Sequence, residues 1–158
     1  MKTIFYVIVL SLLWACNQQT GQDFSQSDPQ ELMDVDLQFA QVASEKGISQ
    51  AFYQYADQKA IILRQGQFPW KGPEEIKENW QTVVSSFSSP PQLSWNPTKA
   101  EIARSGDLGY TFGTYEFTVL DSLDNPSISF GNYVTVWKRQ GDGSWKYVLD
   151  GGAATPAP

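Results

Sequence analysis

The side chains that this chain offers for chemistry are carboxylates, phenols and amines. It has no histidine, which excludes imidazole general bases, Ser-His-Asp and Cys-His nucleophile pairs, and histidine-ligated zinc. Its single cysteine, Cys16, excludes an intramolecular disulfide and any cysteine-rich metal site. Acid–base work is therefore left to Asp, Glu, Tyr and Lys, and the sequence predicts neither a metal site nor a cofactor.

The charge of the chain argues against a nucleic-acid partner. Its formal net charge is −6, and −7 once Lys2 leaves with the N-terminal segment described below. No cluster of lysines and arginines interrupts this acidic balance. Because affinity for a phosphate backbone is largely a matter of positive charge, we expect no nucleic-acid binding.

The N-terminus has the pattern of a secretion signal. Lys2 precedes an apolar run over residues 4–15 that only Ser11 interrupts. Such a run is too short to cross a bilayer of roughly 30 Å as a stable helix, and it is typical of the apolar core of a signal peptide.

The tetrapeptide Leu13-Trp14-Ala15-Cys16 resembles a bacterial lipobox. The alternative is an ordinary signal peptide with an incidental cysteine, which is disfavoured because the only cysteine falls at the cleavage point. Residues 17–27 are rich in Gln, Ser, Thr and Gly, which predicts a flexible tether over residues 16–27. The resemblance to bacterial lipoproteins implies that residues 1–15 are removed and that Cys16 is lipidated. It implies a cell-envelope location, with the lipid as the only membrane contact. Because Asn17 follows the cysteine, the outer membrane is expected in a Gram-negative host.

Three helices are predicted in the first part of the folded domain. Asp28-Pro29 suits the start of the first helix and Gly47 its end. A second helix is predicted over residues 49–55 and a third from Pro73, with the compact apolar run 60–63 as a buried strand between them. Apolar residues recur at helical spacing in the first and third helices: Leu32, Val35, Phe39, Val42 and Ala43, then Ile76, Trp80, Val83, Val84 and Phe87.

The C-terminal half predicts an antiparallel meander. Aromatic residues make up 14% of the chain and gather there, which favours ring packing on a sheet. In the last strand Trp145, Tyr147 and Leu149 alternate with Lys146, Val148 and Asp150. The predicted strands cover residues 93–104, 108–120, 128–140 and 145–150.

Gly113 interrupts the alternation of the second of these strands. Tyr110 and Phe112 share one parity, whereas Tyr115 and Phe117 share the other. Strict alternation would put the two pairs on opposite faces. We expect a bulge at Gly113 that returns them to one face and bends the strand.

The order of helices followed by a meander indicates an α+β domain over residues 28–152, with helices on one face of a curved sheet. Residues 153–158 are small and proline-bearing, which predicts a disordered tail.

Several short stretches along residues 30–152 together carry a resemblance to a known family. They are Asp36 and Phe39, Ala51-Phe52 with Tyr55, Lys71-Gly72-Pro73-Glu74-Glu75-Ile76, Ser105-Gly106-Asp107-Leu108-Gly109-Tyr110, Gly113-Thr114-Tyr115, Gly131-Asn132-Tyr133, Trp137-Lys138, Gly143-Ser144-Trp145-Lys146 and Asp150-Gly151-Gly152. These stretches resemble the nuclear transport factor 2-like superfamily, and within it the SnoaL-like, ketosteroid-isomerase-related proteins classed as domain of unknown function 4440. The resemblance implies a cone-shaped, strongly curved antiparallel sheet closed by three N-terminal helices, a pocket inside, and dimerisation through the sheet.

The resemblance also implies where chemistry would lie, because isomerases of the superfamily use an aspartate base and a tyrosine oxyanion donor in an apolar pocket. Asp57 stands near the position of that base, although an aspartate in a helix-to-strand turn is more often a turn former. Asp150 is the better candidate for a polar group at the cavity mouth; the alternative is a strand-end carboxylate satisfied by local amides. The residues expected to line the pocket, or simply to fill it, are Tyr55, Trp80, Trp95, Tyr110, Tyr115, Tyr133 and Trp137.

Three functions remain open at this point. The leading hypothesis is a lipid-anchored envelope domain that binds a small apolar or aromatic molecule, or a partner, without established catalysis. The second is an isomerase- or dehydratase-type enzyme with Asp150 or Asp57 as base and a tyrosine as oxyanion donor. The third is a dimeric assembly module with a filled interior. The interior of the fold distinguishes them.

Overall fold

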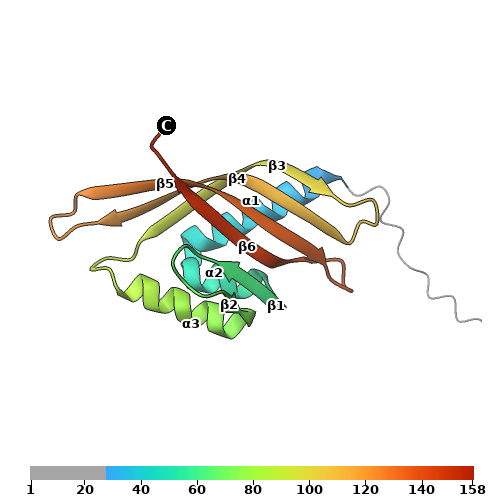
Figure 1. Ribbon diagram of the computed structural model, residues 1–158, viewed down its shortest axis with the longest axis horizontal. Helices are drawn as coiled ribbons and strands as arrows, with labels where there is room; N and C mark the ends of the chain where they lie inside the picture. Colours follow the sequence, from blue (N-terminus) through green and yellow to red (C-terminus); the bar gives the residue numbers. More distant parts are fainter. Residues whose placement is uncertain (1–27) are drawn as a thin grey trace, which may run out of the picture.

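The computed structural model describes residues 28–158, and it shows three helices on one side of a curved six-stranded sheet (Figure 1). This arrangement confirms the predicted α+β class. The predicted signal peptide, the tether and Cys16 lie outside the described residues. The elements are α1 Pro29–Lys46, α2 Ile48–Tyr55, β1 Ala56–Leu63, β2 Trp70–Lys71, α3 Gly72–Ser85, β3 Gln92–Ile102, β4 Leu108–Leu120, β5 Pro126–Arg139 and β6 Trp145–Thr155.

Helix α1 begins and ends where its sequence predicts. The Asp28 side chain accepts a hydrogen bond from the Gln30 backbone amide at 2.9 Å, and Gly47 ends the helix with a positive φ of 89°. The buried positions are Leu32, Asp36, Phe39 and Ala43. Three of them are apolar, as expected, but the fourth is a carboxylate. Among residues 28–158, no helix is long and apolar enough to span a membrane.

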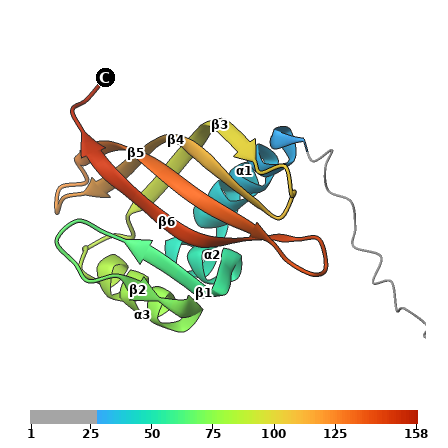
Figure 2. The same cartoon turned by 45° about the vertical axis from the view of Figure 1, so that its right-hand side comes forward.

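The strands follow the order β2-β1-β6-β5-β4-β3. Strands β3 to β6 form the predicted antiparallel meander, and β1 pairs parallel to β6, so the sheet is mixed rather than wholly antiparallel. Figure 2 shows β6 between β1 and β5. The parallel register sets Ile62 opposite Asp150, which brings Arg64, just after β1, to the same end of the sheet as Asp150.

The bulge expected at Gly113 is wrong. Strands β4 and β5 pair without a register shift, so β4 alternates strictly, with Tyr110 facing away from the side that holds Tyr115. The irregularity lies instead in β3, between Pro97 and Lys99, because a proline cannot donate to the ladder. Gly113 allows this close approach, since a Cβ there would lie 2.0 Å from the Asn96 carbonyl oxygen.

Strand β6 contains a bulge that the alternation in the sequence did not predict. Val136 pairs with Leu149 but the next residue, Trp137, pairs with Tyr147, so one extra residue of β6 has no partner. Such a bulge reverses the facing of the residues beyond it. Asp150 therefore faces the helices, on the same side of the sheet as Tyr147, and not the opposite side.

The tail prediction is wrong for residues 153–155. Strand β6 continues to Thr155, because β5 is long enough to offer residues 130–132 as ladder partners. Paired backbone groups hold this small-residue segment in extended form.

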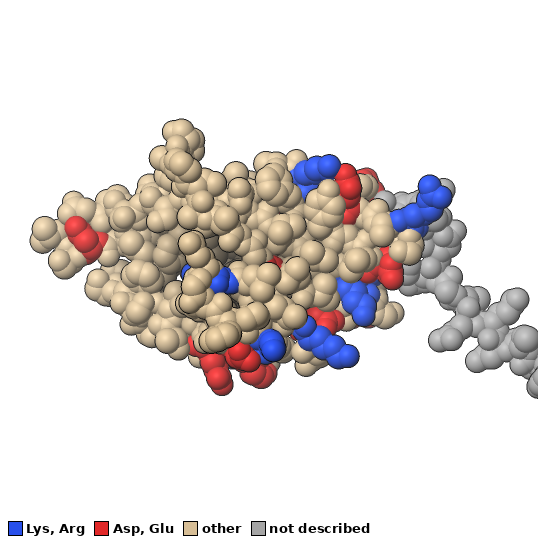
Figure 3. Space-filling view, viewed as in Figure 1, with Lys and Arg blue, Asp and Glu red and all other residues tan. Residues whose placement is uncertain are grey.

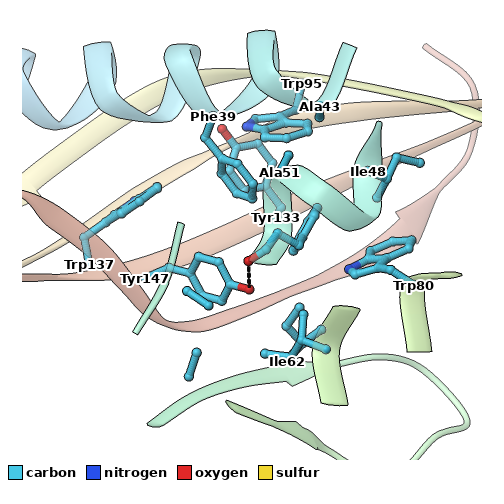
Figure 4. Close-up of a cluster of buried hydrophobic side chains, with 14 of the residues drawn as sticks. Phe39, Ala43, Ile48, Ala51, Ile62, Trp80, Trp95, Tyr133, Trp137 and Tyr147 are labelled. Carbon is cyan, nitrogen blue, oxygen red and sulfur yellow. Dashed lines mark hydrogen bonds between the residues drawn. The ribbon is translucent and has the colours of Figure 1, made fainter. Parts of the chain in front are cut away.

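Aromatic rings pack between the helices and the sheet (Figure 4). Trp137 and Tyr147 are fully buried, and the Tyr147 hydroxyl donates to the Phe52 carbonyl oxygen at 2.7 Å, the dashed line in Figure 4. Phe39 contacts both rings, at centroid distances of 6.0 and 5.8 Å. Phe39 and Phe52 also form part of the wall of a cavity, so the packed core ends where that cavity begins.

Candidate functional site

A cavity of about 290 Å³ lies between the helices and the sheet. Most of its wall is aromatic or aliphatic, and its polar groups come from the end of β1 and from the inner faces of β4, β5 and β6. In the space-filling view, a hollow on this face contains basic atoms within a largely uncharged surface (Figure 3). The residues that line the cavity are Phe39, Phe52, Ile62, Leu63, Arg64, Gln65, Gln67, Trp80, Leu93, Trp95, Tyr115, Phe117, Ser129, Tyr133, Thr135, Asp150, Gly151, Gly152 and Ala154.

Among the described residues, Asp150 is the one carboxylate that lines this cavity. Its Oδ2 accepts a hydrogen bond from the Thr135 hydroxyl at 2.6 Å. Burial raises the pKa of Asp150 to about 7, and the charge of Asp36 acts in the same direction. The Thr135 hydrogen bond and the Arg64 charge oppose the rise. The Asp150 carboxyl group therefore changes its protonation state near neutral pH.

A second carboxylate, Asp36 of α1, lies behind the cavity wall. It is completely buried, and it accepts hydrogen bonds from Trp95 Nε1 at 2.8 Å and from the Tyr133 hydroxyl at 2.7 Å. Burial raises the pKa of Asp36, while these hydrogen bonds lower it. Burial and the Asp36 charge also raise the pKa of Tyr133. Because its proton is committed to Asp36, Tyr133 is a poor donor to a ligand.

Asp36 was not among the predicted site residues, although a signal for it exists in the sequence. It occupies a position of the buried stripe, four residues after Leu32 and three before Phe39. A carboxylate on such a stripe must find donors in the interior. The sequence does not reveal that those donors are Trp95 and Tyr133.

Tyr115 is the other tyrosine of the cavity wall. Its ring lies over two glycines: a Cβ at Gly131 would stand 2.3 Å from the ring, and one at Gly152 would stand 3.3 Å from it. Among residues 28–158, its hydroxyl has no hydrogen-bond partner, and it lies close enough to Arg64 to influence the pKa of that side chain. Tyr115 is therefore the phenol that remains available to a ligand.

Arg64 was not predicted, although it follows directly on the apolar run 60–63. Its guanidinium carbon lies 4.4 Å from the ring centroid of Trp80 and 5.3 Å from that of Trp70. Burial lowers the pKa of Arg64, and the nearby Tyr115 and Asp150 groups oppose the shift. A guanidinium remains charged in proteins, so the cavity wall carries a permanent cation.

The structure places Asp57 outside this cavity. Asp57 lies within β1 rather than in the expected turn, beside the irregularity between Ala56 and Ile61, and its Oδ1 accepts from the Lys59 backbone amide at 2.8 Å. Its Oδ2 accepts from Gln140 Nε2 at 3.2 Å. Asp57 and Asp150 are thus not brought together, and Asp57 has no access to a molecule in the cavity.

The remaining predicted ligand-binding residues divide into two groups. Trp80 and Trp95 line the cavity together with Tyr115 and Tyr133. Three others do not line it: Trp137 is fully buried and donates to the Thr111 hydroxyl at 2.9 Å, Tyr55 packs on Phe39, and Tyr110 lies on the outer face of β4.

The sequence matches no protein-family model and no curated protein. Solved structures do match it. A ketosteroid isomerase-like protein from Erwinia carotovora atroseptica is 11% identical, with a TM-score of 0.66 over 84% of this chain and 99% of that one. An NTF2-like protein with a cystatin-like fold from Novosphingobium aromaticivorans is 13% identical, with a TM-score of 0.66 over 83% and 84%.

A third match is a hexachlorocyclohexane dehydrochlorinase, LinA-type3, from Novosphingobium barchaimii. It is 18% identical, with a TM-score of 0.65 over 80% of this chain and 86% of that one. Identities this low show the fold alone. The chain therefore has the nuclear transport factor 2-like fold, an α+β arrangement of three helices on a curved, unclosed mixed sheet.

Proposed function

We propose that this chain binds a small, largely apolar molecule in the cavity between its helices and its sheet. The observation that carries the proposal is a cavity of about 290 Å³ with an aromatic wall, on which Arg64, Tyr115 and Asp150 supply polar groups. Ligand pockets typically have this composition, and their volumes begin at about 300 Å³. An open interior also argues against the alternative of an assembly module with a filled core.

A tryptophan in place of Leu93 tests this proposal, because Leu93 lines the cavity and a larger side chain would occupy the space. With a neutral, environment-sensitive naphthalene ketone such as prodan as the probe, we expect Leu93→Trp to weaken binding at least about tenfold. The matched control is Leu123→Trp, at a residue that is 79% exposed in the β4–β5 loop, and it should bind as the wild type does. Undiminished binding by Leu93→Trp, or none by the wild type, would contradict the proposal.

A second candidate function is proton transfer in an isomerase- or dehydratase-type reaction. The observation that favours it is the pKa of about 7 that burial gives Asp150, since a general base works best with a pKa near the operating pH. The Asp150 carboxylate would take a proton from the carbon between a ketone and an alkene. The Tyr115 hydroxyl would donate to the enolate oxygen, and Asp150 would return the proton to the γ-carbon.

The isomerisation of 3-cyclohexen-1-one to 2-cyclohexen-1-one measures this chemistry by ultraviolet absorbance. We expect the rate to rise with pH through an apparent pKa near 7, because Asp150 must be ionised to act as the base. The isomerisation rate of Asp150→Asn should be at least about 100-fold lower than that of the wild type. The rate of Asp57→Asn should be unchanged, because Asp57 lies outside the cavity. A wild-type rate equal to that of buffer would leave the binding function standing and remove this candidate.

We further propose that a lipidated Cys16 holds the domain in the bacterial cell envelope. The support is the tetrapeptide Leu13-Trp14-Ala15-Cys16 at the end of an apolar N-terminal run. In a bacterial host, Cys16→Ser should move the protein from the detergent-extractable membrane fraction to the soluble fraction. Retention of the variant in membranes would refute the lipid as the anchor.

Dimerisation through the sheet is likewise a proposal, as is assignment to the subgroup of domain of unknown function 4440. Exposed apolar side chains on the outer face of the sheet support a dimer: Phe112 pairs with Val134, which pairs with Gly151, which in turn pairs with Leu63. The side chains of Phe112, Val134 and Leu63 are 42%, 40% and 47% exposed. Sedimentation equilibrium of the folded domain measures its mass directly, and a monomer at millimolar concentration would exclude the dimer.

A further inference from the structure

The cavity wall carries a cation that no group within the described residues 28–158 neutralises. Among residues 28–158, the Arg64 guanidinium has neither a hydrogen-bond acceptor nor a carboxylate within ion-pair distance. The two indole rings of Trp70 and Trp80 are set nearly at right angles, at 86°, with Arg64 against both. Contacts with ring faces orient a guanidinium but leave its N–H edges free to donate.

Asp150 does not serve as the counter-ion of Arg64. No ion pair joins the two residues, and Asp150 accepts from Thr135 instead. With a pKa of about 7 it is in part neutral under physiological conditions. The other nearby carboxylate, Asp36, is enclosed by Trp95 and Tyr133. The positive charge of Arg64 is therefore left for a group that enters the cavity.

A second donor in the same wall also lacks a partner. Trp80 is 5% exposed and lines the cavity, and its Nε1–H is the one buried side-chain polar atom without a hydrogen-bond partner among residues 28–158. Figure 4 shows this nitrogen turned toward the other labelled rings of the interior. An unsatisfied buried donor is rare in native proteins and calls for an acceptor. Arg64 and Trp80 thus form a pair of adjacent donors, because the guanidinium lies 4.4 Å from the Trp80 ring.

We propose that the ligand of this cavity is an aromatic or alicyclic carboxylate, whose carboxylate group accepts hydrogen bonds from Arg64 and Trp80 Nε1. This inference rests on the binding function proposed above. The apolar body of such a ligand would lie against Phe52, Leu93 and Phe117, which complete the wall. A phosphate ester is disfavoured, because Arg64 is the only lysine or arginine that lines the cavity in the described part of the chain, and one cation does not balance a dianion in an apolar space.

The experiment compares 2-naphthoate with its uncharged isostere 2-naphthamide by isothermal titration calorimetry at pH 7. We expect the wild type to bind the carboxylate at least about tenfold more tightly, because hydrogen bonds to charged groups are the strong ones. Arg64→Gln should remove that preference while still binding the amide. Arg104→Gln, which deletes the same charge at an exposed position outside the cavity, should keep it.

A second measurement reports on Trp80 in the wild-type protein, and the variant Trp80→Phe serves only to assign its resonance. In a nitrogen–proton correlation spectrum, the indole resonance that Trp80→Phe removes should move downfield when 2-naphthoate binds, because its N–H gains a charged acceptor. It should move much less with 2-naphthamide.

The outcomes separate this inference from the function on which it rests. Equal affinities for acid and amide, or an undiminished preference in Arg64→Gln, would overturn the carboxylate assignment and leave the binding function intact. If neither compound nor the neutral probe binds the wild type, both proposals fall together.

Discussion

The free energy of unfolding is expected to fall by about 2–3 kcal/mol as the pH rises from 5 to 8, and Asp150 accounts for most of this fall. Burial raises the pKa of Asp150 to about 7 in the folded protein, whereas an unfolded aspartate titrates near 3.9. Between these values the folded state holds a proton that the unfolded state releases. Stability is therefore greatest at the acidic end of the window and is lost as the pH rises.

The composition of the chain makes this effect measurable. With no histidine, no imidazole titrates between pH 5 and 8. Asp36, with a pKa also raised by burial, contributes with the same sign. Glu31, whose pKa is lowered mainly by the Arg139 hydrogen bond, acts with the opposite sign and below this window. Tyr133 and Tyr147, whose pKa values the Asp150 charge helps to raise, titrate above this pH window.

Urea denaturation of tag-free protein at several pH values measures how the free energy of unfolding changes with pH. In Asp150→Asn the unfolding free energy should depend much less on pH, and the variant should be more stable than the wild type at pH 8, because a partly buried carboxyl group no longer has to ionise. Asp124→Asn, in the exposed β4–β5 loop, should keep the wild-type slope. A wild-type stability that is constant or increases from pH 5 to 8 would show that the pKa of Asp150 is not raised in the folded protein.

Phe39→Ala is expected to destabilise the fold by about 3–5 kcal/mol, the usual cost of removing a buried aromatic ring. Phe39 is 1% exposed, and its ring lies within 6.0 Å of five others. Those rings come from α2, β3, β5 and β6, so the truncation would open a void where most elements meet. The five partners are Phe52, Tyr55, Trp95, Trp137 and Tyr147.

The control for this variant is Phe68→Ala, since Phe68 is 91% exposed in the loop between β1 and β2. Its truncation should change the unfolding free energy by no more than about 0.5 kcal/mol. The loss of unfolding free energy in Phe39→Leu should lie between the losses in Phe39→Ala and Phe68→Ala, because a leucine fills part of the void. Similar denaturation midpoints for Phe39→Ala and Phe68→Ala would mean that Phe39 is not the centre of the core.

The elements of this fold that short-range rules govern were predictable. The cap at Asp28, the stop at Gly47 and the apolar stripes of α1 and α3 each depend on residues within a few positions of one another. The same holds for the alternating strands of the meander. These rules were enough to give the α+β class and the order of the elements apart from the short strand β2.

The bends of the sheet were not predictable in the same way. The glycine at position 113 suggested a bulge in β4, but the irregularity lies in the neighbouring β3 at Pro97. A glycine in a strand indicates only that another group lies close to its backbone. Which strand deviates depends on the partner, because a bulge is a property of a pair of strands.

The candidate site was predicted in its residue types but not in its arrangement. Asp150 was singled out from the sequence, yet the alternation of its strand places it on the side opposite Tyr147. The unpredicted bulge of β6 turns it toward the helices and beside Thr135. Asp57, the other candidate base, stays outside because its carboxylate is held by Lys59 and Gln140.

By itself, then, the sequence determined the three helices, the strands of the meander, the two ends of α1 and which chemistry is excluded. Only the tertiary structure decided which polar groups share the interior. Asp36 is satisfied by donors 59 and 97 residues away, and Arg64 reaches the end of the sheet that holds Asp150 through the parallel pairing of β1 with β6. The physical reason is that propensity and capping act over a few residues, whereas the burial of a charge depends on strand register and on contacts between distant parts of the chain.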